Sequence, residues 1–162
     1  MVIMKNKLLE SSYHALQEAN RWKHIAKSID DKNNLCREYG VILSYASELY
    51  LKCILMFNGI KCTGHNLYAL YNQLPNNIKD IFKSKYNLDT IIKKDFFTEK
   101  LVGTYTGFEE GIKLVSYDFV DLRYIYEKYD MGKIVYVANE VHLEINNILE
   151  EYSRSLTFNW DD

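Results

Sequence analysis

Apolar residues recur at alternating three- and four-residue steps along four stretches of the chain, which is the spacing of one face of an α-helix. The most apolar stretch spans residues 33–58, where apolar side chains also fill most of the remaining helix circumference. A helix that is apolar nearly all round needs neighbours on most sides, so residues 33–58 are predicted to form a central, buried helix. Its repeating face consists of Cys36, Tyr39, Leu43, Ala46, Tyr50, Cys53 and Phe57.

Three polar residues interrupt this apolar helix at a regular interval. Ser44, Glu48 and Lys52 are spaced by four residues, so they lie along one line on the helix surface. Any chemistry of the central helix is therefore expected on that line.

The other three long stretches predict helices over residues 4–28, 106–129 and about 130–152. Shorter helices are expected after Gly64 and over residues 77–85, whereas residues 87–105 show no readable periodicity. Four long helices joined by one irregular connection predict a single all-α domain over residues 1–162. The expected architecture is an antiparallel up-and-down bundle of four long helices plus short extra helices. The inward faces are predicted as Leu8, Ser12, Ala15, Ala19, Trp22, Ala26 and Ile29; Leu67, Leu70, Tyr71 and Leu74; Ile78, Ile81 and Phe82; Phe108, Ile112, Val115, Phe119, Leu122, Tyr126 and Tyr129; and Ile134, Val137, Val141, Ile145, Ile148 and Tyr152.

Local signals predict where several of these helices begin and end. Gly59 follows the central helix and can adopt the left-handed conformation of a helix C-terminus. Asn66 or His65 is expected to cap the next helix, and Pro75 to stop it. Residues 106–109, with the sequence TGFE, fit a capping box that opens the third long helix, and Asp130 is expected to cap the last one.

Composition limits the classes of function. The chain carries a formal net charge of −2 and 26% charged residues, so it has no global basic signature of nucleic-acid binding. Three cysteines without a CxxC pair suggest neither a disulfide framework nor a zinc site, and no cofactor motif is present. The most apolar run, residues 49–57, is interrupted by Lys52 and is shorter than a membrane span requires. We therefore expect a cytoplasmic protein without metal, cofactor or membrane contact.

Two segments resemble a known family. The run YASELYLKCIL, followed by a glycine and then GHNLYALYNQL, resembles the first half of the HEPN superfamily, the higher eukaryotes and prokaryotes nucleotide-binding domain. Members show a Glu and a Lys four apart on the second helix and a His-x-Leu at the start of the third, which correspond here to Glu48, Lys52, His65 and Leu67. The later LRYIYE, residues 122–127, resembles an Arg-Tyr element near the end of the penultimate helix, which singles out Arg123, Tyr124 and Glu127.

The resemblance implies a helical bundle that commonly dimerises and works with RNA or nucleotides. Many members are metal-independent ribonucleases of toxin–antitoxin, abortive-infection or CRISPR-linked systems, and others are partners of minimal nucleotidyltransferases or inactive binding modules. The nuclease branch carries an Arg followed by a His after four to six residues. Here only two residues separate Arg21 from His24, and Arg123 is followed by no histidine before His142, so that signature is absent. Whether the protein is an enzyme is left open.

The candidate residues also have structural explanations. Glu48 and Lys52 can form an ordinary helix-surface ion pair worth about 0.3–0.5 kcal/mol, and Arg123 can pair with Glu48 for purely structural reasons. His65 can be a helix cap or an inter-helix hydrogen-bonding residue. A cluster of lysines can contact a phosphate backbone, with Tyr86 and Phe96 nearby, or form a solvated face interleaved with acidic residues. These lysines are Lys79, Lys83, Lys85, Lys93 and Lys94.

The resulting hypothesis is a HEPN-like homodimer that acts on or binds RNA or a nucleotide in a toxin, phage-defence (antiviral) or stress system. The alternative is a non-catalytic, antitoxin-type interaction module that pairs with a nucleotidyltransferase or another defence protein. The predicted catalytic residues are Arg123 and His65, and the predicted binding residues are Glu48, Lys52, Tyr124 and Glu127.

Overall fold

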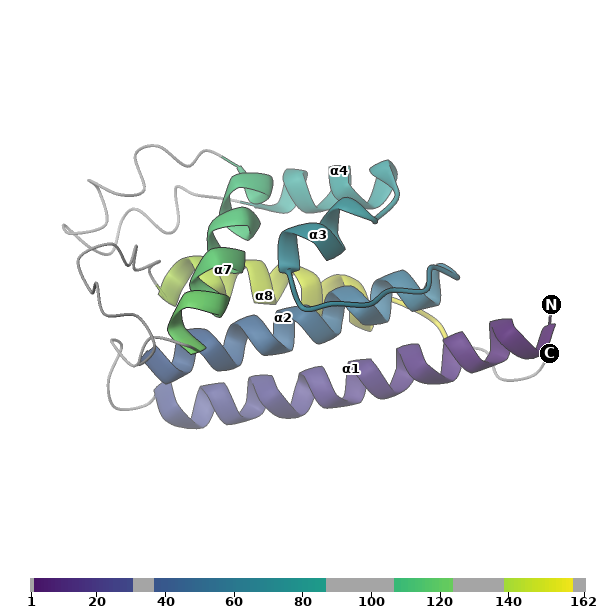
Figure 1. Ribbon diagram of the computed structural model, residues 1–162, viewed down its shortest axis with the longest axis horizontal. Coiled ribbons are helices and arrows are strands. Elements are labelled where there is room, and N and C mark those ends of the chain that lie inside the picture. The colour runs from purple at the N-terminus through teal and green to yellow at the C-terminus, as the bar shows by residue number, and fades with distance from the viewer. Residues whose placement is uncertain (1, 31–36, 87–106, 124–138, 159–162) are drawn as a thin grey trace.

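All regular secondary structure in the described residues is helical. The computed structural model describes residues 2–30, 37–86, 107–123 and 139–158. The helices are α1 (Val2–Asp30), α2 (Arg37–Phe57), α3 (Leu67–Asn72), α4 (Asn76–Lys85), α7 (Phe108–Arg123) and α8 (Asn139–Arg154) (Figure 1). The prediction of an all-α protein is confirmed for these residues.

α1 and α2 form a pair of antiparallel helices that pack along their length (Figure 1). The close approach follows from small residues on the inner face of α1, where Ser12, Ala15, Ala19 and Ala26 are buried as predicted. The Ser12 hydroxyl donates a hydrogen bond of 2.7 Å to the Cys53 carbonyl oxygen of α2. This bond satisfies a buried hydroxyl that would otherwise be costly at a helix interface.

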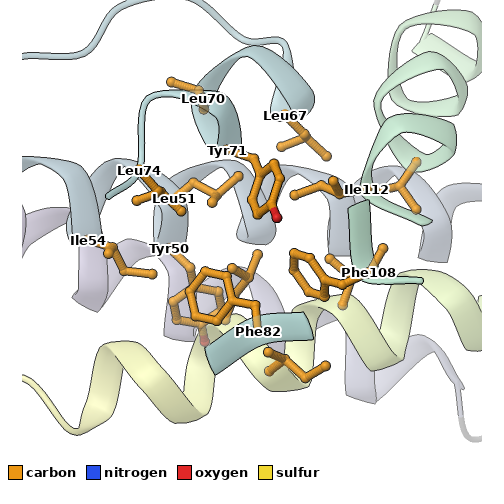
Figure 2. Packing of buried hydrophobic residues seen from close by; sticks show 14 of the residues in the cluster. Tyr50, Leu51, Ile54, Leu67, Leu70, Tyr71, Leu74, Phe82, Phe108 and Ile112 are labelled. Carbon is orange, nitrogen blue, oxygen red and sulfur yellow. The ribbon is translucent and has the colours of Figure 1, made fainter. Parts of the chain in front are cut away.

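α2 is the central helix of the core, as its apolar sequence predicts. Figure 2 shows its Tyr50, Leu51 and Ile54 side chains among residues of α3, α4 and α7, and α8 packs against it as well. The described helix begins at Arg37 rather than at residue 33, and Cys36 lies outside the described residues. The residues of this cluster from outside α2 include Leu67, Leu70, Tyr71, Leu74, Phe82, Phe108 and Ile112.

By length and composition alone, Glu38–Phe57 of α2 could cross a bilayer, and this segment is longer than the run of residues 49–57 that was predicted to be too short. Within this segment, 61% of the apolar window is buried inside the fold. Core helices of water-soluble proteins meet the same criterion, so the feature is weak evidence for membrane insertion.

Gly59 ends α2 in the predicted left-handed conformation, with φ of 74°. The Gly59 amide donates to the Met56 carbonyl oxygen and the Ile60 amide to that of Leu55, at 3.0 and 2.9 Å. These two bonds form a Schellman motif, which satisfies the last carbonyls of the helix. The chain then reverses, so residues 60–66 can return along α2.

α3 and α4 form a short helical pair over the core, separated near Pro75. Asn66 rather than His65 caps α3, since the Asn66 side-chain oxygen accepts a 2.8 Å hydrogen bond from the Ala69 amide. The predicted inward residues of α3 are buried, as are Ile78 and Phe82 of α4. Ile81 is 38% exposed, so its predicted burial is wrong. α4 contacts the core along a stripe too narrow to cover all three of its apolar residues.

α7 and α8 complete the described fold. α7 packs on α2 and α3, and α8 lies along α2 (Figure 1). Phe108, Ile112 and Val115 of α7 and Val141, Ile145 and Ile148 of α8 are buried as predicted, and Tyr152 is half-buried.

Several predicted features of these two helices lie outside the described residues. They are Thr106 of the capping box, the segment 87–105, the extension of α7 to residue 129 and the Asp130 cap. Glu109, the other side chain of the predicted capping box, is described. Its carboxylate accepts a hydrogen bond of 3.2 Å from the Tyr68 hydroxyl.

Candidate functional site

Glu48 is a buried carboxylate in the middle of α2. It is 1% exposed, whereas an ordinary helix-surface Glu is solvated. Its neighbours on α2 include the buried Ser44 and Ser47 as well as apolar residues, and the helix as a whole is buried in the core, so α2 carries this charge into the protein interior. A buried charge is costly unless it is paired and hydrogen-bonded, and Glu48 is paired.

Lys52 and His65 meet on the same oxygen of Glu48. The Lys52 Nζ atom lies 2.7 Å from Glu48 Oε1, and His65 Nδ1 lies 2.9 Å from it. The side chains of Lys52 and His65 are 19% and 69% exposed. The structure thus brings together three predicted site residues, with the carboxylate inside and the imidazole at the surface. We name Glu48, Lys52 and His65 the Glu48 cluster.

The geometry assigns the proton on His65. A carboxylate only accepts hydrogen bonds, so His65 Nδ1 must carry a hydrogen and donate it to Glu48 Oε1. When the ring is neutral, Nε2 is then the nitrogen without a hydrogen, and when the ring is protonated both nitrogens carry one. The other carboxylate oxygen, Oε2, is buried and has no hydrogen-bond partner among the described residues.

The loop before α3 positions His65. Gly64 adopts φ of +91°, a conformation that residues with a Cβ rarely adopt. Asn66 caps α3 on the other side of His65. His65 is therefore held between a left-handed glycine and a helix cap, which orients its ring toward α2.

Cys62 of the same loop is half-buried and lies near the charges of Lys52 and Glu48. Burial raises the pKa of its thiol, and the lysine only partly opposes this effect. A reactive cysteine needs a lowered pKa, so Cys62 is not suited to act as a nucleophile beside His65.

The remaining predicted site residues lie at or beyond the end of α7. Arg123 is the last residue of that helix, but its side chain lies outside the described residues, as do Tyr124 and Glu127. α7 itself is next to the α3 end of the cluster, because the Tyr68 amide donates a 2.7 Å hydrogen bond to the Ser116 hydroxyl of α7.

A second buried polar group lies between α2 and α8. Ser44 Oγ and His142 Nδ1 are 2.9 Å apart, and the Asn146 side chain donates to the Leu43 carbonyl oxygen and to Ser47 Oγ. Sequence reasoning singled out Ser44 on the line with Glu48 but found no role for His142 or Asn146. Their spacing of four residues on α8 was the available signal.

Lys23 forms a third polar group, between α1 and α8. It is 3% exposed, and its ammonium donates to Asn147 Oδ1 at 2.6 Å and to the Glu150 carboxylate. Burial lowers the pKa of Lys23, and Glu150 opposes the shift. Arg154 also pairs with Glu150 at 2.9 Å. The group fixes α1 against α8, and sequence reasoning missed it.

The lysines of α4 make local contacts. Lys83 lies 3.4 Å from Glu109, and Lys85 lies 2.8 Å from Glu151. Lys79 donates to the Asn72 carbonyl oxygen and lies over the Tyr71 ring. Tyr86 packs edge-on against Phe108. These contacts favour the predicted solvated face over a phosphate-binding patch; Lys93, Lys94 and Phe96 lie outside the described residues.

No group of three or more His, Cys, Asp or Glu side chains suited to a metal ion occurs in the described part of the chain. No family model matches the sequence, and neither the curated proteins nor the solved structures include a match to it. The resemblance to the HEPN superfamily therefore stays a prediction.

Proposed function

We propose that this chain is a HEPN-like helical protein that binds RNA or a nucleotide, with Lys52 and His65 of the Glu48 cluster contacting phosphate. The observation that supports the proposal is the meeting of Lys52 and His65 on the buried Glu48 carboxylate. These are three residues that carry the resemblance to the family. Glu48 and Lys52 come from α2 and His65 comes from the loop before α3, with Glu48 and His65 17 residues apart in the sequence.

The burial of Glu48 is hard to explain by helix stability alone. A surface Glu–Lys pair at this spacing contributes about 0.3–0.5 kcal/mol, whereas removing a carboxylate from water costs several kcal/mol before pairing is counted. An apolar side chain in its place would avoid that cost. A buried carboxylate is useful where it holds neighbouring donors in fixed positions, and here those donors are partly exposed.

The proposal extends to the architecture and the setting. α1, α2, α7 and α8 would be the four long helices of an antiparallel bundle, and the protein would act as a cytoplasmic homodimer in a toxin, phage-defence or stress system. Binding is favoured over catalysis because the Arg-to-His spacing of the nuclease branch is absent. A non-catalytic module that pairs with a nucleotidyltransferase or another defence protein is the alternative.

The test is binding of fluorescent single-stranded RNA and of nucleotides to the wild type and to Lys52→Met and His65→Gln. Each substitution should weaken binding by about 1–3 kcal/mol, or roughly 5- to 150-fold, because Lys52→Met removes an ammonium donor and His65→Gln removes the imidazole that donates to phosphate when it is protonated. Lys61→Met is the matched control, since Lys61 is exposed in the same loop. Equal losses of affinity in Lys61→Met and Lys52→Met would indicate only a general electrostatic attraction to RNA. If the wild type binds neither RNA nor nucleotides, the result would favour the interaction module.

Arg123 is tested by a separate pair of variants, because its charge cannot be shed by deprotonation. If Arg123 contacts phosphate, Arg123→Lys keeps the charge but loses the bidentate fork, so affinity falls while the melting temperature is unchanged. Glu48→Gln measured in parallel reports on a purely structural ion pair. Loss of stability in both variants with unchanged affinity would contradict a binding role for Arg123.

A further inference from the structure

The charge of the Glu48 cluster depends on one titratable group. Glu48 and Lys52 carry opposite charges and lie 2.7 Å apart, so together they are close to neutral. His65 adds no charge when its imidazole is neutral and one positive charge when it is protonated. The affinity of the cluster for an anion should therefore depend on the state of His65.

The position of His65 suits such a role. Its Nδ1 atom is engaged by Glu48, and its side chain is 69% exposed. Nε2 is therefore the nitrogen available to a ligand, as an acceptor when the ring is neutral and as a donor when it is protonated. A phosphate oxygen is an acceptor, so only the protonated ring can donate to it through Nε2.

The contact with Glu48 is not needed to cap α3. Asn66 provides the cap through its own side chain, and the imidazole of His65 instead contacts the buried carboxylate on another element. The Glu48–His65 contact thus orients a surface ring against a buried carboxylate.

We infer that His65 is a proton-controlled phosphate contact and that Glu48 is its positioning residue. The inference rests on the proposed function and adds its regulation: phosphodiester ligands bind more tightly as the pH falls from 8 to 6, the range in which histidine ordinarily titrates. Other titratable or charged groups on the described neighbouring elements include Lys52 on α2, Lys61 and Cys62 in the loop, Tyr68 on α3, and Glu109, Glu110 and Lys113 on α7; Glu109 and Lys113 contact Tyr68.

The first experiment measures binding of a single-stranded oligouridylate to the wild type between pH 6 and 8. This probe is chosen because neither its phosphodiesters nor uracil titrates in that range. We expect the affinity to rise as the pH falls, by at most about tenfold per pH unit, the limit for uptake of one proton. His65→Gln should abolish this rise, whereas His14→Gln, an exposed histidine on α1, should keep it.

The outcomes separate the inference from the proposed function. Wild-type binding that is equally tight at pH 6 and pH 8 would overturn the inference and leave the proposed function standing. An equal rise in His65→Gln would place the effect elsewhere and also overturn the inference. Absence of oligouridylate binding at every pH would contradict both.

The second experiment measures the His65 tautomer directly, by nitrogen-15 NMR of histidine-labelled protein at pH 8. We expect hydrogen on Nδ1 and a free Nε2 in the wild type. Glu48→Gln should remove this preference, because a glutamine amide can donate to the ring as well as accept from it. A wild-type ring with hydrogen on Nε2, or an unchanged tautomer in folded Glu48→Gln, would overturn the positioning role whatever the binding results.

Discussion

Tyr50 and Tyr71 are both fully buried, but only one of their hydroxyl groups has a hydrogen-bond partner among the described residues. Tyr50 donates to the Asn20 side-chain oxygen at 2.8 Å, whereas the Tyr71 hydroxyl has no partner. A hydrogen bond contributes about 1 kcal/mol net, and a buried hydroxyl without a partner costs about 1–3 kcal/mol. The two side chains therefore form a natural comparison.

We predict that Tyr71→Phe is as stable as the wild type or more stable by up to about 1 kcal/mol, and that Tyr50→Phe is less stable by about 1 kcal/mol. Phenylalanine keeps each ring and its packing, including the contact of Lys79 with the Tyr71 ring. Urea unfolding of both variants gives the free energies. A loss at Tyr71 as large as that at Tyr50 would show that the Tyr71 hydroxyl is satisfied.

Buried tyrosines also make stability depend on alkaline pH. Burial is the main cause that raises the pKa of Tyr71 and of Tyr86 from 10.0 to about 12. The folded protein keeps these protons when the unfolded chain has lost them, so their contribution is complete below pH 10 and is lost as the pH rises toward 12. Lys23 acts in the opposite direction, since burial lowers its pKa, but it is a single group.

We therefore predict that the free energy of unfolding falls between pH 10 and pH 11.5, and that Tyr86→Phe makes the fall shallower. Denaturant unfolding at several pH values measures both slopes. Tyr13→Phe is the control, because Tyr13 of α1 is only half-buried. The prediction fails if the wild type and Tyr86→Phe lose stability in parallel.

At this scale the sequence predicted residues that are close along one helix and missed those that meet across helices. Glu48 and Lys52 are four residues apart, so helical geometry places them together. Lys23 and Glu150 are 127 residues apart, and nothing in a helical repeat specifies which polar residues on two helices will face each other. His65 was found through the resemblance, and its contact with Glu48 is of the inter-helix kind that was one of its two expected structural roles.

Among the elements, the loop between α2 and α3 has the most influence on the candidate site. Gly59 and Gly64 both have positive φ values, and an added Cβ would meet no atom within 4 Å at either position. Substitution by alanine is therefore strained by backbone conformation rather than by contact. Gly59 ends α2, whereas Gly64 directly precedes His65.

We predict that Gly64→Ala and Gly59→Ala each lower stability by roughly 1 kcal/mol, but that only Gly64→Ala also weakens RNA binding by the folded protein. The reason is that strain at Gly64 is relieved by shifting His65 away from Glu48. Urea unfolding and RNA titration on the same preparations separate the two effects. Equal affinities in the two variants would mean that the loop does not set the position of His65.

The element level was the most predictable, because helix faces follow from local spacing. Most of the described periodic apolar positions of α2, α3 and α8 are buried, and Gly59 and Asn66 act as the expected end signals. Ile81 was mispredicted because periodicity shows which residues share a face and not how much of that face a neighbour covers. Short α4 has only a narrow contact with the core.

For the whole molecule, the sequence established the helical class but not how the helices cross. α2 is apolar on most of its circumference and so required neighbouring helices on most sides. These neighbours are α1, α3, α7 and α8. The crossing of two helices depends on side-chain ridges that meet only in the folded state, so an up-and-down bundle was one arrangement among several that bury the same faces.

The predicted homodimer belongs to this scale as well. Five tyrosines of the last two predicted long helices could supply an apolar surface for a partner, but Tyr152 packs edge-on against Phe82 of its own chain, at 5.2 Å between ring centroids. The other four tyrosines, Tyr124, Tyr126, Tyr129 and Tyr136, lie outside the described residues. Dimerisation therefore depends on the family resemblance and on these residues.

We predict that the protein sediments at twice its 19.2 kDa mass at concentrations on the order of tens of micromolar. A dilution series should show a reversible return to 19.2 kDa, because a symmetric interface obeys mass action. Replacing Tyr124, Tyr126 and Tyr129 together by serine should shift the equilibrium toward the monomer. The same triple change at Tyr13, Tyr45 and Tyr68 controls for lost aromatic surface, because these three tyrosines are only half-buried in the described fold. A single species of 19.2 kDa at every concentration would remove the dimer, and with it any binding site that needs residues from both copies.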